Sequence, residues 1–217
     1  MTGGYNNNGH PLFSSDMFKV ENGVITKVDP NDPQLPTPQL PSYKDGHCMA
    51  RIDSKRVFIA GGNNKNAYIY NEITGNFTDL PNTIGERYDP ACTTITTSNK
   101  MVLMVVGGHD NRDEVNSQTS AEIFDMKDCK DESISCNGKW EKQEHVLDKI
   151  GGFEKGEYVN YNDKRGLVMI GSHDSSSSRS LVNFNETENN FKELQPQMRF
   201  ARWGHSAVII PDGHITC

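Results

Sequence analysis

Short hydrophobic runs, separated by polar loops, recur along the whole chain. Three of these runs end at Gly-Gly or Gly-Ser: RVFIA before Gly61-Gly62, MVLMVV before Gly107-Gly108, and LVMI before Gly171-Ser172. Each run is short, rich in β-branched residues or methionine, and apolar at successive positions. This pattern is typical of a strand that is buried on both faces. An earlier Gly-Gly, at 3–4, marks a further unit of the same kind.

The segments between these glycine sites also repeat in a fixed order. A second group of strands is expected at 16–20, 67–71, 121–126 and 180–185. After a turn or an insert, one large apolar residue opens a closing strand: Val24 or Ile25, Phe77, Trp140, and Phe191. A strand that starts the next unit is expected at 46–53, 91–97, 156–162 and 204–213. The stretch 140–150 has some helical character, but we expect it to leave a strand into a loop or a short helical turn.

Each unit therefore contains four short strands, and the units repeat about every 45–65 residues, a period typical of propeller blades. No segment shows a sustained helical period. We expect an all-β chain with about four four-stranded blades, in units at 1–42, 43–86, 87–150 and 151–200. The first strands of another unit are expected at 201–217.

Composition narrows the classes of function. The 217 residues carry a net charge of −7, and without a stripe of Lys and Arg we expect no nucleic-acid partner. No stretch is long and apolar enough to predict a membrane span. The first residues show no basic stretch followed by an apolar one, so no secretory leader is predicted. This slightly favours the cytoplasm over the extracellular space and leaves the compartment open.

The five cysteines and two glycosylation sequons bear on the same question. Cys48, Cys92 and Cys217 lie in or beside apolar runs, and we interpret them as small buried hydrophobic residues. Cys129 and Cys136 flank a polar loop, where they either form a bridge in an oxidising compartment or stay free in the cytosol. We favour the free thiols because no leader is predicted. The sequons begin at Asn76 and Asn185, but chance can supply them in a chain rich in asparagine.

The ordered recurrence of these features resembles the kelch-repeat β-propeller family, which includes galactose oxidase. The segment PQMRFARWGHSAVIIPDGHI is similar to the family's Pro-x-Met…Arg…His-Ser-Ala…Asp-Gly-x-Ile stretch. The chain departs from the pattern at Ser172, in the insert 127–139, and in a first unit without a clear aromatic residue. The resemblance implies a propeller, which we expect to be part of a larger ring of about six blades. The other interpretation is a four-bladed ring in which 204–217 and 16–29 share one blade.

Some of the repeated residues are expected to serve the architecture. Glycine permits sharp turns and close approach of a neighbouring side chain, and we expect the aromatic residue of the fourth strand to fill that space. The residues interpreted in this way are Gly61, Gly62, Gly107, Gly108, Phe77, Trp140 and Phe191.

Catalytic motifs are scarce. The sequence contains no GxxxxGK[ST], GxSxG or HExxH motif. GGHD and GSHD recur at one phase of the repeat, so His109, Asp110, His173 and Asp174 are the candidates for metal ligands or acid–base residues. We prefer to interpret them as loop residues inherited by duplication, and we expect neither a metal nor another cofactor.

The resemblance also implies a binding face, formed by residues after the glycines and residues leading into the first strands. The first group comprises Tyr5, Asn7, Asn63, Lys65, His109, Asn111, His173 and Ser175. The second comprises His47, Thr93, Glu157 and His205, with Arg202 and Trp203 nearby. We expect a non-catalytic module that binds a protein or peptide, as in the substrate-recognition part of a BTB–kelch ubiquitin-ligase subunit. The alternatives are an enzyme of the copper-radical oxidase or sugar-modifying type, and an extracellular interaction protein.

Overall fold

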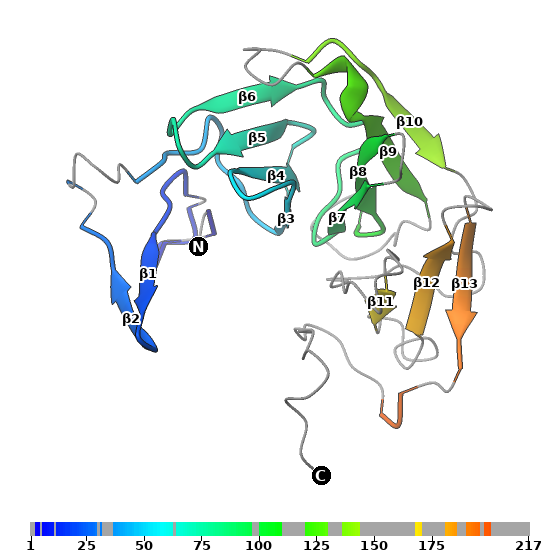
Figure 1. Cartoon of the computed structure of the whole chain (residues 1–217), viewed down its shortest axis with the longest axis horizontal. Helices are drawn as coiled ribbons and strands as arrows, with labels where there is room; N and C mark the ends of the chain where they lie inside the picture. The colour runs from blue at the N-terminus through cyan, green and yellow to red at the C-terminus, as the bar shows by residue number, and fades with distance from the viewer. Residues whose placement is uncertain are drawn as a thin grey trace.

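The described part of the chain is almost entirely β-structure. The computed structural model describes residues 3–4, 6–10, 12–29, 31, 37–62, 64–96, 100–109, 120–129, 136–143, 168–170, 181–185, 190–195 and 198–200. These residues form strands β1 to β13, in four antiparallel sheets, and one 3-10 turn, η1 (Met126–Asp128). The expectation of an all-β chain is therefore confirmed. In Figure 1 the sheets follow one another along an arc, with β3 and β7 on its concave side and β6 and β10 on its convex side.

Two of the sheets are complete four-stranded meanders, in which each strand pairs with the next one along the chain. The first contains β3 (His47–Arg51), β4 (Arg56–Gly61), β5 (Ala67–Asn71) and β6 (Phe77–Leu80). The second contains β7 (Ala91–Thr96), β8 (Met101–Val106), β9 (Ala121–Asp125) and β10 (Trp140–Gln143). Residues 81–90 link the two sheets.

The other two sheets have fewer strands within the described residues. One is the hairpin of β1 (Phe18–Glu21) and β2 (Val24–Lys27), and the other contains β11 (Val168–Ile170), β12 (Leu181–Asn185) and β13 (Asn190–Leu194). In this last sheet Phe184 pairs with Phe191, as Tyr70 pairs with Phe77 in the first complete sheet. The strands expected at 156–162 and 204–213 lie outside the described residues.

The central strands β4 and β8 are buried on both faces, as their hydrophobic runs predict. In β4, Phe58 and Ala60 point into the cluster between the two complete sheets, whereas Ile59 packs with Leu40 and Tyr70 on the opposite face. The last five residues of β8 are all buried. Because successive side chains of a strand alternate between faces, a continuous apolar run requires a neighbour on each side.

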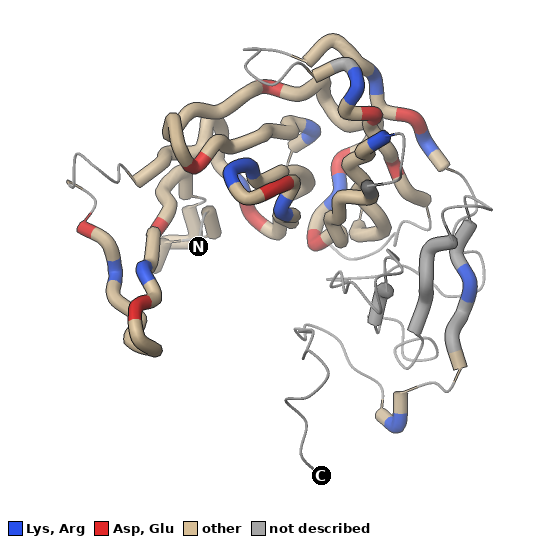
Figure 2. Tube along the Cα trace, in the orientation of Figure 1, with Lys and Arg blue, Asp and Glu red and all other residues tan. Residues whose placement is uncertain are grey.

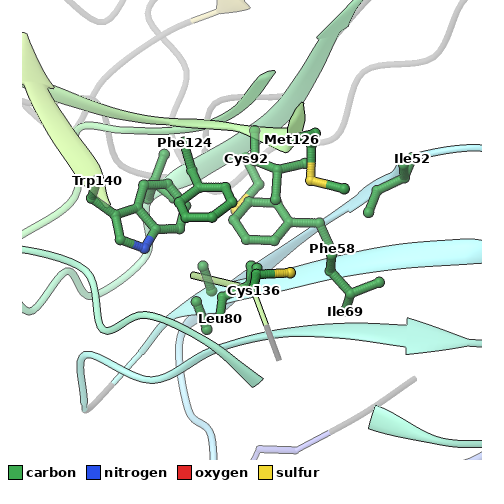
Figure 3. Packing of buried hydrophobic residues seen from close by; sticks show 13 residues of the cluster. Ile52, Phe58, Ile69, Leu80, Cys92, Phe124, Met126, Cys136 and Trp140 are labelled. Carbon is green, nitrogen blue, oxygen red and sulfur yellow. The ribbon is translucent and has the colours of Figure 1, made fainter. Parts of the chain in front are cut away.

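The cluster between the two sheets is the main core, and aromatic rings fill its centre (Figure 3). Trp140 of β10 packs against Phe58 of the first sheet and Phe124 of its own, with ring centroids 5.9 and 5.4 Å away. Its indole Nε1 donates a hydrogen bond to the Pro81 carbonyl over 2.7 Å, so its polar atom is satisfied. Burial of one such aromatic side chain stabilises a fold by roughly 1.5–3 kcal/mol.

The paired glycines lie where the linking chain passes closest to a strand end. Gly62 has a φ of +85°, and a Cβ there would lie 2.6 Å from the Asp45 carbonyl oxygen. Gly108 has a φ of +83°, and a Cβ there would collide with the Tyr88 carbonyl. Side chains are therefore excluded by both conformation and space. The nearest atoms belong to the linking backbone, which differs from the fourth-strand aromatic residue expected from the sequence.

Two disulfides correct the interpretation of the cysteines. Cys48 of β3 is bonded to Cys92 of β7, so the first strands of the two complete sheets are covalently joined. The burial expected of Cys92 is confirmed, because it is 6% exposed in the main core, but the bond between these two residues was not expected. Cys129 is bonded to Cys136 and closes the loop after β9, rather than leaving two free thiols. Cys217 lies outside the described residues.

Candidate binding face

Antiparallel order places the candidate residues at one end of the two complete sheets. In a meander the first strand begins, the second ends and the third begins at the same end. We call this the glycine end; it comprises segment 37–46, the described residues of the loop 62–66, the link 81–90 and residues 107–109. The other end, which carries the turns 52–55 and 72–76, is called the turn end. Register agrees with this assignment, because His47 at the start of β3 pairs with Gly61 at the end of β4.

Lys44 is buried at the base of the glycine end, with 0% of its surface exposed. Its ammonium donates hydrogen bonds to the Gly61 carbonyl at 2.7 Å, to Asn64 Oδ1 at 2.7 Å and to the Asn66 carbonyl at 2.5 Å. The ammonium also lies 5.7 Å from the centroid of the Tyr68 ring. Burial lowers the pKa of Lys44 to about 7. One side chain thus holds the end of β4, the following loop and the start of β5 together.

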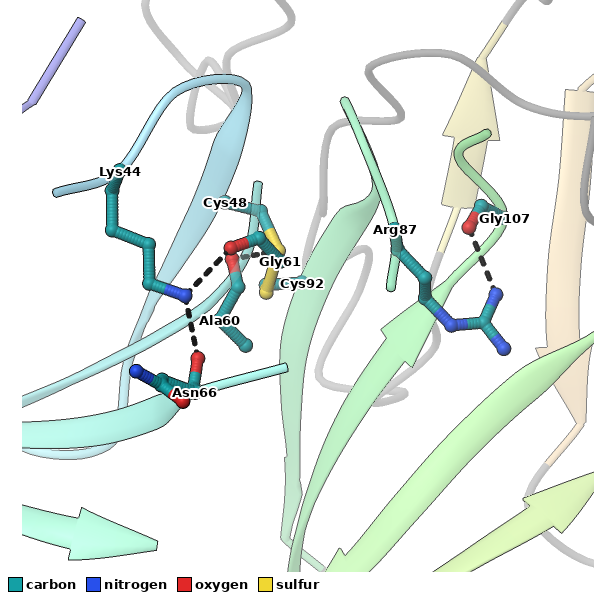
Figure 4. Close-up of a disulfide and its surroundings, with 8 residues drawn as sticks. All are labelled: Lys44, Cys48, Ala60, Gly61, Asn66, Arg87, Cys92 and Gly107. Atoms are coloured by element: carbon teal, nitrogen blue, oxygen red, sulfur yellow. Dashed lines mark hydrogen bonds between the residues drawn. A yellow bond between two sulfur atoms is a disulfide. The ribbon is translucent and has the colours of Figure 1, made fainter. Parts of the chain in front are cut away.

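Arg87 performs the same task in the second complete sheet (Figure 4). Its Nη1 donates to the Gly107 carbonyl at 2.9 Å and to the Ser120 carbonyl at 3.0 Å. Gly107 corresponds to Gly61, and Ser120 directly precedes the third strand of its sheet, as Asn66 does. Lys44 and Arg87 therefore occupy equivalent positions in the two complete sheets.

Glu122 of β9 completes the second anchor. Its Oε1 accepts from Arg87 Nε at 2.9 Å, and each of these two side chains is 1% exposed. The same carboxylate accepts from the backbone N–H groups of Ile84 at 2.6 Å and Gly85 at 3.1 Å. A buried carboxylate is tolerated when it is paired and hydrogen-bonded in this way. The link 81–90 is thereby fixed to the second sheet.

The link is also tied to the first sheet. The Thr83 hydroxyl and backbone N–H both donate to the Lys65 carbonyl, at 3.1 and 2.9 Å. The Gly62 N–H donates to the Arg87 carbonyl at 2.7 Å. The loops of the glycine end therefore rest on a hydrogen-bonded base that spans both sheets.

Two histidines lie in this base rather than at its surface. Half-buried His47 has a pKa lowered to about 4, chiefly by burial and further by Lys44, whereas Asp45 opposes the shift. His109 is 2% exposed, and its backbone forms an antiparallel bridge with Tyr88 through hydrogen bonds of 2.8 and 2.9 Å. The sequence suggested that His109 faces a ligand, but this bridge holds its side chain beneath the surface.

The exposed part of the glycine end, together with Phe13 of the neighbouring segment 12–15, whose carbonyl accepts from the Leu40 N–H at 2.9 Å, carries apolar side chains that the sequence analysis missed. Phe13 is 49% exposed, Tyr43 42% and Ile84 46%. The rings of Phe13 and Tyr43 meet edge to face with centroids 5.8 Å apart, and the Tyr43 carbonyl accepts from Asn64 Nδ2 at 3.2 Å.

The structure places the residues expected on the binding face in different environments. Asn7 and Lys65 are exposed, and Asn7 lies in a turn in which Asn6 Oδ1 accepts from the Asn8 and His10 N–H groups. Thr93 is buried within β7. Tyr5, Asn63, Asn111, Glu157, His173, Ser175, Arg202, Trp203 and His205 lie outside the described residues.

The described residues contain no group of three or more His, Cys, Asp or Glu side chains arranged to hold a metal ion. Of the four candidates for metal or acid–base chemistry, His109 alone lies within them. Figure 2 shows positive and negative residues interspersed along β3 to β10. Among the described residues, no helix has the length and apolar character needed to cross a membrane.

Comparison of the chain with protein-family models found no match, and comparison with curated proteins found none either.

Proposed function

We propose that the chain is a kelch-type β-propeller module that binds a protein or peptide at its glycine end and catalyses no reaction. The repeated order of strands, glycines and aromatic residues supports the kelch assignment. Two adjacent four-stranded meanders, with further sheets along the same arc, are consistent with the blades of a propeller.

One observation carries the binding function: exposed aromatic residues lie above a rigid, buried base. Phe13 and Tyr43 present two rings to solvent, and the residue after Tyr43 is the fully buried Lys44. Aromatic side chains are enriched at the energetic centres of protein interfaces. Loops held by a rigid scaffold lose little conformational entropy on binding, so this arrangement suits recognition of a partner.

The two disulfides favour one setting for this function. Disulfides persist in oxidising compartments and are rare in the cytosol, and the described residues contain two. An extracellular interaction module is therefore favoured over the substrate-recognition part of a BTB–kelch ubiquitin-ligase subunit. The second candidate function is an enzyme of the copper-radical oxidase or sugar-modifying type. Stoichiometric copper or zinc in the purified protein would favour this enzyme over the binding module.

A peptide-display selection against the folded full-length chain tests the binding function. We expect selected peptides to lose at least tenfold in affinity when Phe13 and Tyr43 are both replaced by alanine. The matched control is Ile73→Ala, because Ile73 is a 72% exposed apolar residue at the turn end. Affinity should change less than twofold in this control. Equal losses in both variants, or no enrichment on a folded protein, would refute binding at the glycine end.

A further inference from the structure

The turn between β5 and β6 presents an asparagine whose side chain is not used by the fold. Asn76 is exposed at the turn end. Its backbone carbonyl accepts from the Asn71 N–H at 2.9 Å, and its N–H donates to Thr74 Oγ1 at 3.4 Å. Within the described part of the chain, the Asn76 carboxamide makes no hydrogen bond. Asn71, in contrast, caps the turn, because its Oδ1 accepts from the N–H groups of Ile73 at 2.9 Å and Thr74 at 3.2 Å.

Asn76 begins the sequon Asn76-Phe77-Thr78, and the local structure leaves room for a modification there. Phe77 packs on Tyr70 and Tyr68 with ring centroids 4.9 and 6.1 Å apart. The aromatic ring is thus held against its own sheet, whereas Asn76 remains exposed in the turn. A large polar group on Asn76 does not require this packing to change.

The disulfides supply an independent observation about the compartment. Cys48–Cys92 and Cys129–Cys136 both require an oxidising environment during folding. In eukaryotic cells the same secretory compartment carries out transfer of glycans to Asn-x-Ser/Thr sequons. We propose that Asn76 is an acceptor for an N-linked glycan, added while the chain folds in an oxidising secretory compartment.

The second sequon provides an internal comparison. Asn185 pairs with Asn190 next to the Phe184–Phe191 pair, so it occupies the position that Asn71 holds beside the Tyr70–Phe77 pair. Asn71 uses its carboxamide to cap the turn, whereas Asn76 does not. The exposed Asn76 is therefore the site that the structure assigns.

The position of Asn76 also separates the modification from the candidate binding face. The turn 72–76 lies at the turn end, and the exposed aromatic pair lies at the glycine end. A glycan on Asn76 leaves the glycine end clear, and the proposal does not rest on the proposed function.

The test expresses the full chain behind a cleavable leader in cultured eukaryotic cells. Secreted and cell-retained pools are alkylated before reduction, treated with peptide N-glycosidase F in heavy-oxygen water, and mapped by mass spectrometry. We expect most secreted molecules to show labelled aspartate at Asn76 and to resist alkylation at Cys48. Thr78→Val, which is isosteric, should abolish the label, whereas Thr78→Ser should retain it.

Two outcomes overturn the proposal. One is an Asn76 that stays unmodified in both pools, whatever the redox state of the cysteines. The other is an Asn76 that is modified in the retained pool and unmodified in the secreted protein, because the glycan is then incompatible with the native fold. Folding of each threonine variant is checked by its thermal unfolding, so that loss of the label is not confused with misfolding.

Discussion

Lys44 and Arg87 occupy equivalent positions in two neighbouring sheets, but the protein holds the two buried cations in different ways. Arg87 pairs with the buried carboxylate of Glu122. Lys44 binds three uncharged oxygens and, within the described residues, contacts no carboxylate. The Arg87 guanidinium stays charged at all ordinary pH values, whereas burial lowers the pKa of Lys44 to about 7.

The comparison shows that the two sheets share the same hydrogen-bonded connection, whereas the ion pair occurs in the second sheet. In each of the two complete sheets, one long basic side chain joins the first glycine carbonyl to the carbonyl that precedes the third strand. In the second sheet, the Glu122 carboxylate pairs with Arg87 and also holds the link 81–90. Removing a partner should therefore affect the two anchors differently.

The largest expected effect comes from Glu122→Leu. This change leaves the Arg87 charge unpaired and the Ile84 and Gly85 N–H groups without their acceptor. Breaking a buried ion pair in this way typically costs about 3–5 kcal/mol, which urea-induced unfolding can measure. The double variant Arg87→Met/Glu122→Leu is the control, and it should recover part of that loss. A single variant within about 1 kcal/mol of the parent would show that Glu122 does not hold the link.

The two disulfides are expected to differ as well. Cys48–Cys92 spans 44 residues of sequence and Cys129–Cys136 spans 7. Loop-closure entropy predicts losses of about 4 and about 2.5 kcal/mol, respectively, when each pair is replaced by alanine. Thermal unfolding of the two double variants measures this difference. A larger loss for the shorter loop would contradict the view that Cys48–Cys92 stabilises the junction of the sheets.

His47 should make stability depend on pH in the acidic range. Its pKa is about 4 in the folded chain and ordinarily 6.5, so the unfolded chain binds the proton more tightly. The free energy of unfolding should therefore be highest above pH 6.5 and fall by about 2 kcal/mol between pH 7 and pH 5. His47→Gln should flatten this dependence, as measured by chemical unfolding at each pH. Parallel profiles for the two proteins would exclude His47 as the cause.

Lys44 should give a dependence of similar size in the alkaline range. Its pKa falls from 10.5 to about 7 on folding, so the unfolded chain binds the proton more tightly above pH 7. Stability should then rise between pH 7 and pH 9 by about 2 kcal/mol, because the folded chain gives up this proton near pH 7 and the unfolded chain keeps it. Lys44→Met should remove this rise and leave the Arg87 anchor intact. An unchanged rise in the variant would assign it to another group.

The strands could be predicted from the sequence because local pattern determines them. The run MVLMVV is β8, and AYIYN is β5. In both, apolar or β-branched residues fill successive positions between polar turns, and this information lies within each segment. Tyr70 and Phe77, which the pattern places in consecutive strands, pair across one turn.

Contacts between sheets could not be predicted in the same way. The bond between Cys48 and Cys92 depends on how β3 and β7 pack, which no local pattern specifies. The burial of His109 follows from its bridge to Tyr88, and the exposure of Phe13 and Tyr43 follows from the path of segment 37–46. Gly62 and Gly108 lie against the linking backbone, where the sequence led us to expect aromatic rings.

The central claim is that the glycine end binds a protein or peptide, and hydrogen–deuterium exchange with a bound, display-selected peptide tests it most directly. We predict that the peptide slows exchange in segments 6–15, 40–46 and 62–66, and leaves the turns 52–55 and 72–76 unchanged. Two results would contradict the claim. One is slower exchange confined to those turns, and the other is unchanged exchange throughout a protein that is saturated with the bound peptide.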